Sequence, residues 1–165
     1  MTAIGSDAGE PLGVRAPVMG QRRRLALRGV RGHVAKGRDF TREAIRDWGW
    51  PSNQTSEDAL LVVSELLTNA SLHAGGCDEL VLTYGTALRI EVLDGETELP
   101  APRVTPRGTP GGHGLAIVQR LSDRWGADAH ASGKVVWAEI EGSRLATGDT
   151  APVRGEPGPN GPTVQ

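Results

Sequence analysis

The chain has 165 residues, a length that favours one folded domain with tails. Its formal charge of −2 argues against direct nucleic-acid binding, and its single cysteine, Cys77, excludes an intrachain disulfide and a cysteine metal cluster. No stretch approaches the ~18 apolar residues of a membrane span, and the N-terminus lacks the apolar core of a signal peptide. We therefore expect a cytoplasmic protein that does not associate with membranes.

The 23 glycines and 11 prolines are not evenly spread, and the two ends of the chain hold more of them per residue than the middle. Such segments bury too little apolar surface to offset the entropy lost on ordering. The composition predicts a disordered leader at 1–21, a folded unit at 22–141, and a disordered Gly/Pro-rich tail at 142–165.

Hydrophobic periodicity predicts helices laid on one face of a sheet. Apolar residues from Ala59 to Ala70 recur at three- and four-residue steps, which indicates a helix, and alternation over 88–93 indicates a strand. The basic run at 22–24 is read as a solvated strand start. In chain order, the predicted elements are a strand at 24–28, helices at 34–48 and 56–73, strands at 80–84 and 88–93, a helix at 115–125, and strands at 128–131 and 135–140. The expected fold class is α+β, a two-layer sandwich with a mostly antiparallel mixed sheet.

The central predicted helix carries polar residues beside its apolar stripe. Glu65, Asn69 and His73 are spaced four apart and so share one helix face. One interpretation is that they are boundary and surface residues. The other is functional: a carboxylate can accept a proton, and an amide oxygen is a hard ligand suited to Mg²⁺.

Two further segments each allow two interpretations. Asp94-Gly95 ends a predicted strand and is either a turn or a carboxylate that accepts a hydrogen bond from the adenine amine. The glycines between 108 and 114 precede a predicted helix, where backbone N–H groups can approach phosphate. They form either a phosphate-binding segment or a plain loop, and no Gly-Lys-Ser/Thr follows them as in a P-loop.

Taken in order, these segments resemble one family. The stretch 64–74, containing Ser-Glu-Leu-Leu-Thr-Asn-Ala and then His73, resembles the N box of the GHKL, or histidine-kinase-like, ATPases. Residues 92–95 resemble the adenine-binding segment, 112–126 the phosphate-loop box with its following helix, and 133–140 the closing strand. The N box resembles that of the anti-sigma-factor serine/threonine kinases of actinobacteria more than that of the histidine kinases.

The resemblance implies a Bergerat-type ATP-binding fold with ATP and Mg²⁺ as cofactors. Glu65 would be the general base that acts on a Ser or Thr hydroxyl of a partner, and Asn69 would hold Mg²⁺. Asp94 would bind adenine, and the remaining nucleotide-binding positions would be Gly112, Gly114 and Leu115. The implied partners are a STAS-domain anti-sigma-factor antagonist and a sigma factor, and the resemblance is compatible with a homodimer.

Three departures from the family pattern concern ATP affinity. Glu96 and Glu98 stand where the adenine box commonly has glycines, and Lys134 stands where many members have a Thr near adenine. The loop before Gly112 offers only Arg103 and Arg107 as cations. The departures favour an alternative function, a non-catalytic module that sequesters a sigma factor or other regulator, with nucleotide structural or absent.

Overall fold

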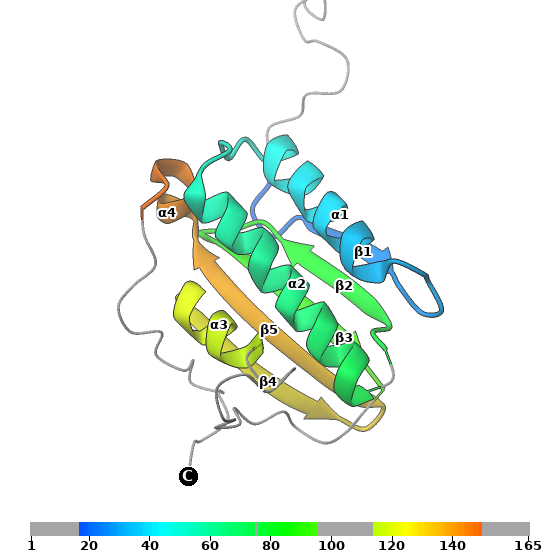
Figure 1. Ribbon diagram of the computed structural model, residues 1–165. Helices are drawn as coiled ribbons and strands as arrows, with labels where there is room; N and C mark the ends of the chain where they lie inside the picture. Colours follow the sequence, from blue (N-terminus) through cyan, green and yellow to red (C-terminus); the bar gives the residue numbers. More distant parts are fainter. Residues whose placement is uncertain (1–16, 75, 96–113, 150–165) are drawn as a thin grey trace, which may run out of the picture.

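The computed structural model describes residues 17–74, 76–95 and 114–149 (Figure 1). Along the chain the elements are β1 (Arg22–Ala26), α1 (His33–Asp47), α2 (Gln54–Ala74), β2 (Glu79–Thr83), β3 (Ala87–Asp94), α3 (Gly114–Leu121), β4 (Arg124–His130), β5 (Gly133–Glu141) and α4 (Gly142–Thr147). The predicted strands and the three predicted helices are all present, with ends that differ by a few residues.

The five strands form one sheet in the order β1-β2-β3-β5-β4. All four pairings between the described strands are antiparallel, so the expected antiparallel character of the sheet is confirmed and no parallel pair occurs among them. Helices α1, α2 and α3 lie side by side over one face of this sheet, with α2 in the middle (Figure 1). The fold is the predicted α+β two-layer sandwich.

The core lies between α2 and the central strands. The apolar stripe of α2 is fully buried, from Ala59 through Val63 and Leu67 to Ala70. Alternate residues of the two central strands face it: Leu88, Ile90 and Val92 from β3, and Val136, Ala138 and Ile140 from β5. Because side chains alternate between the faces of a strand, the next residues in each series, Asp94 and Lys134, also lie on the helix-covered face.

The predicted helix at 115–125 is too long. Helix α3 ends at Leu121, and β4 begins at Arg124. The backbone N–H of Asp123 donates to the carbonyl oxygen of Glu139 at 2.9 Å, which starts the pairing with β5. Trp125 is thereby placed in the strand and buried on the helix-covered face. The apolar periodicity predicts a longer helix, but the chain instead pairs with β5 from Asp123 onward, and the helix ends first.

The predicted disordered tail is wrong for its first residues, because 142–147 form helix α4. Leu145 is completely buried, and its carbonyl oxygen accepts a hydrogen bond from Asn53 Nδ2 at 2.7 Å. Arg144 and Asp123 form an ion pair at 2.9 Å with both side chains largely buried. Short-range composition did not reveal these long-range partners.

Candidate nucleotide-binding site

Glu65 and Asn69 lie one turn apart in α2 and are both partly buried. The flank of α2 that faces α1 is marked by two contacts: Arg38 Nη1 donates to Ser64 Oγ at 3.0 Å, and a hydrogen bond joins Ser71 Oγ to His33 Nε2. At ~100° per residue, Glu65 and Asn69 project from the opposite flank, toward α3. They therefore border the space between α2 and α3 and avoid the α1–α2 contact.

Helix α3 runs opposite to α2. Its C-terminal end meets α4, where Arg144 Nη2 donates to the carbonyl oxygen of Leu121 at 3.4 Å. Helix α4 in turn contacts the start of α2 through Asn53. The N-terminal end of α3 is consequently directed toward the C-terminal half of α2, the half that carries Glu65 and Asn69 (Figure 1). Leu115, next in α3, is buried and packs into the core.

Asp94 is the last residue of β3 and is almost completely buried. It lies directly opposite Lys134 of β5, and its Oδ1 is 3.4 Å from Lys134 Nζ. The pair lies on the helix-covered face of the sheet. The end of β3 also lies near the C-terminal end of α2, because Asp78, four residues after that helix, donates its N–H to the carbonyl oxygen of Leu93 at 2.7 Å.

Gly133 brings β5 close to the end of β3. Its φ is +152°, and a Cβ at this position would collide with the carbonyl oxygen of Asp94. Only glycine combines this backbone conformation with so close an approach. Gly133 therefore fixes the register that sets Lys134 beside Asp94.

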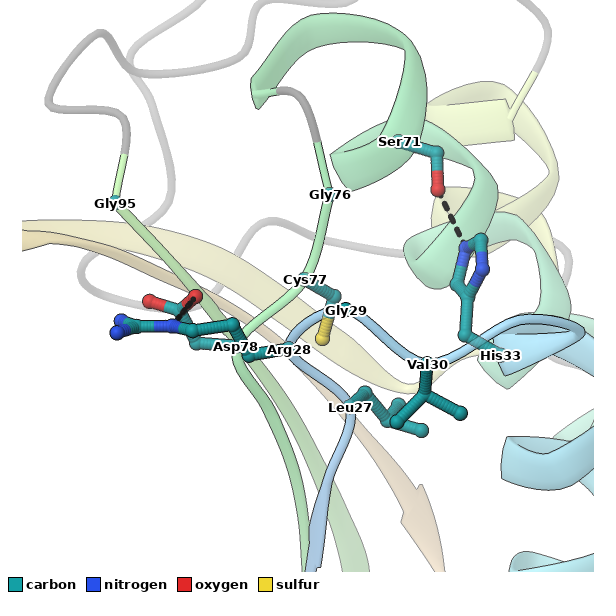
Figure 2. Close-up of a pocket in the computed structure, with 10 residues that line it drawn as sticks. All are labelled: Leu27, Arg28, Gly29, Val30, His33, Ser71, Gly76, Cys77, Asp78 and Gly95. Atoms are coloured by element: carbon teal, nitrogen blue, oxygen red, sulfur yellow. Dashed lines mark hydrogen bonds and ion pairs between the residues drawn. The ribbon is translucent and has the colours of Figure 1, made fainter.

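A cavity of about 480 Å³ opens at the same end of the sheet, on the α1 side of α2 (Figure 2). Its lining includes Gly95, which follows Asp94, and the Ser71–His33 hydrogen bond. Cys77 also lines it and is buried; burial is the main cause that raises the pKa of this thiol to about 12, and the charges of Asp78 and Asp94 add to the effect. The cavity and the Glu65–Asn69 pair lie on opposite flanks of α2.

The donor set at Asn69 fits a magnesium ion held jointly with phosphate. An amide oxygen is a neutral, hard ligand, and Mg²⁺ in phosphate sites takes one or two protein ligands together with phosphate oxygens and water. Among the described residues, no group of three or more His, Cys, Asp and Glu side chains is arranged to hold a metal ion. Within the same part of the chain, no helix is both long and apolar enough to cross a bilayer.

The α+β sandwich, with a polar flank on α2 and a buried carboxylate at the end of β3, is consistent with the predicted GHKL-type ATP-binding fold. Residues 30–140 match the family model described as the histidine kinase-like ATPase domain, and the chain belongs to this family. Membership implies ATP as the ligand and supports a regulatory, ATP-binding role. A comparison with curated proteins gives no significant match.

The structure places part of the predicted site on elements that contact one another, because α2 packs against both β3 and α3. Glu65 and Asn69 share one flank of α2, Asp94 ends β3, and Gly114 and Leu115 begin α3. The remaining predicted positions and the departures in the adenine box lie outside the described residues: Gly112, Glu96, Glu98, Arg103 and Arg107.

The ion pair between Asp94 and Lys134 was missed from the sequence. In the sequence, Lys134 is a departure from the family pattern, and the local pattern does not identify Asp94 as its partner. The sequence does contain one indication of this pair. Lys134 lies near the start of an apolar strand and alternates onto the same face as Val136 and Ala138. That alternation predicts an inward-facing lysine, which needs a buried counter-charge.

Proposed function

We propose that this protein is a cytoplasmic serine/threonine kinase that transfers phosphate from Mg-ATP to a STAS-domain antagonist of an anti-sigma factor. The carrying observation is the arrangement of Glu65 and Asn69. They share the α2 flank that faces α3, one turn apart, and the start of α3 points toward the same half of the helix. Family membership supports the nucleotide, and the N-box resemblance supports the choice of substrate.

Each residue has a distinct role in this proposal. Glu65 accepts the proton of the substrate hydroxyl, and Asn69 supplies an amide oxygen to the metal. Asp94 is the carboxylate that would accept a hydrogen bond from the adenine amine once its ion pair with Lys134 opens, and the backbone at Gly112 and Gly114 approaches the phosphates. When bound, Mg²⁺ would neutralise charge on the phosphates.

The transfer step balances without any further reactant. The substrate hydroxyl oxygen bonds to the γ-phosphorus while the bond from that phosphorus to the β–γ bridging oxygen breaks. ADP leaves with the bridging oxygen, and the hydroxyl proton passes to the Glu65 carboxylate. Positioning and charge neutralisation supply most of the rate enhancement in reactions of this type.

Substitution of Glu65 tests the catalytic assignment. Glu65→Gln keeps the shape of the side chain and removes its basicity, so we expect phosphate transfer to fall by about 100-fold or more while Mg-ATP affinity stays within roughly twofold. Transfer is measured as label from γ-labelled ATP appearing on a STAS-domain protein, and affinity by calorimetry. Glu57→Gln, the same change at an exposed position of α2, is the matched control. Undiminished transfer by Glu65→Gln contradicts the role of Glu65.

The ion pair between Asp94 and Lys134 favours a second candidate function. A carboxylate already paired with an ammonium group is less available to adenine, as expected for a module that binds a sigma factor without turnover. In that case the chain co-migrates with the sigma factor equally with and without Mg-ATP, and no label transfer occurs. A kinase forms its complex with the antagonist in a nucleotide-dependent manner.

A further inference from the structure

Lys134 and Asp94 form a closed ion pair at the place where the base of a nucleotide is expected. Their side chains are 2% and 1% exposed, and Lys134 Nζ lies 3.4 Å from Asp94 Oδ1. At these exposures neither charged group is open to solvent. A purine cannot reach the Asp94 carboxylate until the pair or the atoms that cover it have moved.

The fold leaves Lys134 little freedom to withdraw. Strand β5 lies between β3 and β4, with Asp94 opposite Lys134 on one side and Ala129 on the other. Gly133, in contact with the Asp94 carbonyl, fixes the backbone just before Lys134. The side chain lies on the helix-covered face of the sheet and is 2% exposed, so its ammonium group is shielded from water.

Replacing the ion pair between Asp94 and Lys134 by a contact to the adenine base is energetically unfavourable. Separating a buried pair leaves a charge unpaired in a poorly solvating environment, which is strongly unfavourable. The exocyclic amine of adenine is a neutral donor and replaces the ammonium group only in part. The described residues proposed to contact the metal and the phosphates, Asn69 and Gly114, are not members of this pair.

We propose that Lys134 determines how much the base contributes to nucleotide binding: it holds Asp94 closed, so the wild-type protein recognises chiefly the triphosphate and its metal. The inference rests on the proposed function, because it concerns the base end of the same nucleotide site. It assigns Lys134 as the residue that sets base affinity.

Substitution of Lys134 is the direct test. Lys134→Thr removes the cation, makes room, and leaves a hydroxyl that can donate to Asp94. We expect Mg-ATP to bind this variant roughly tenfold or more tightly than the wild type, and the double variant Lys134→Thr/Asp94→Asn to lose the gain. Calorimetry at one fixed salt concentration gives the affinities. Lys36→Thr, the same change at an exposed position of α1, is the matched control and should bind like the wild type.

A second measurement needs only the wild-type chain, so it tests the inference even if Lys134→Thr does not fold. Mg-tripolyphosphate carries the phosphates without a base. We expect the wild type to bind Mg-ATP and Mg-tripolyphosphate within about threefold of each other. A strong preference of the wild type for Mg-ATP overturns the inference.

The failure of the inference and that of the proposed function give different results. If the wild type binds Mg-ATP as tightly as folded Lys134→Thr, Lys134 does not limit the base, and the kinase proposal still stands. If neither folded protein binds Mg-ATP or Mg-tripolyphosphate, the nucleotide function fails, and the inference fails with it.

Discussion

Three ionisable side chains are buried at the end of the sheet where β3 finishes: Asp94, Lys134 and Cys77. Asp94 and Lys134 are charged and paired, whereas the neighbouring Cys77 thiol is buried beside the negative charges of Asp78 and Asp94. Burial disfavours the thiolate, and nearby carboxylates disfavour it further, so the pKa of Cys77 rises to about 12 from the ordinary value of 9.0. Cys77 is therefore an inert thiol in the folded state, despite lining a cavity.

This pKa shift predicts a pH-dependent loss of stability. Between 9.0 and about 12 the unfolded chain releases the thiol proton and the folded chain keeps it. The contribution of Cys77 to stability is thus fully present below 9.0 and falls as the pH rises above that value. Between about pH 7.5 and about pH 10, we expect the wild type to lose more unfolding free energy than Cys77→Ala. Urea unfolding of both proteins measures the difference. An equal loss in the two proteins contradicts the raised pKa.

At the scale of elements, β4 and β5 depend on a close contact on the face of the sheet away from the helices. Trp137 is 4% exposed although none of the described helices lies on this face. Its ring lies over Gly126 of the neighbouring strand, and the Arg89 guanidinium stacks on it 4.3 Å from the ring centroid. The absence of a side chain at Gly126 provides the space for the indole.

Adding one carbon at Gly126 tests this packing. A Cβ there would lie 2.8 Å from the nearest Trp137 ring atom, and a rigid indole cannot yield by rotating a terminal group. We expect Gly126→Ala to lower the unfolding free energy by about 1–3 kcal/mol. Gly85→Ala, where the nearest atom would be 3.5 Å away, is the control and should change it little. Denaturant unfolding measures both, and equal stability of the two variants contradicts the contact.

For the whole molecule, α4 closes the end of the sandwich opposite the Asp94–Lys134 pair. It contacts α2, β3 and β5, and the backbone N–H of Gly142 donates to the carbonyl oxygen of Thr86 at 2.8 Å. Through Asp123 and Arg144 it also joins the turn between α3 and β4. This short helix therefore links the two layers that hold Glu65 and Asp94.

Truncation separates the contribution of α4 from that of the rest of the C-terminus. We expect a chain ending at Asp149 to unfold at nearly the same denaturant concentration as the full chain. A chain ending at Glu141 should have an unfolding free energy lower by about 2–5 kcal/mol or more, because the buried Leu145 is removed. In the full-length protein, Leu145→Ala should reproduce much of that loss, and exposed Ser143→Ala should not. Equal stability of the two truncated chains contradicts the role of α4.

The sequence by itself determined the order and type of the main elements, the polar flank of α2, and the family. Local periodicity encodes these features: the stripe around Val63 and Leu67 defines the buried face of the helix, so Glu65 and Asn69 must lie at its edge. The match of residues 30–140 to the family model confirms the histidine kinase-like ATPase assignment.

Only the tertiary structure decided which distant groups meet. The register between β3 and β5 pairs Asp94 with Lys134, strand pairing at Asp123 ends α3 early, and Leu145 finds its buried position beside α2. Each contact joins residues at least sixteen positions apart, the separation of Asp123 from Glu139. The free energy of such contacts comes from burial and pairing that exist only in the assembled fold, so no local pattern in the chain contains it.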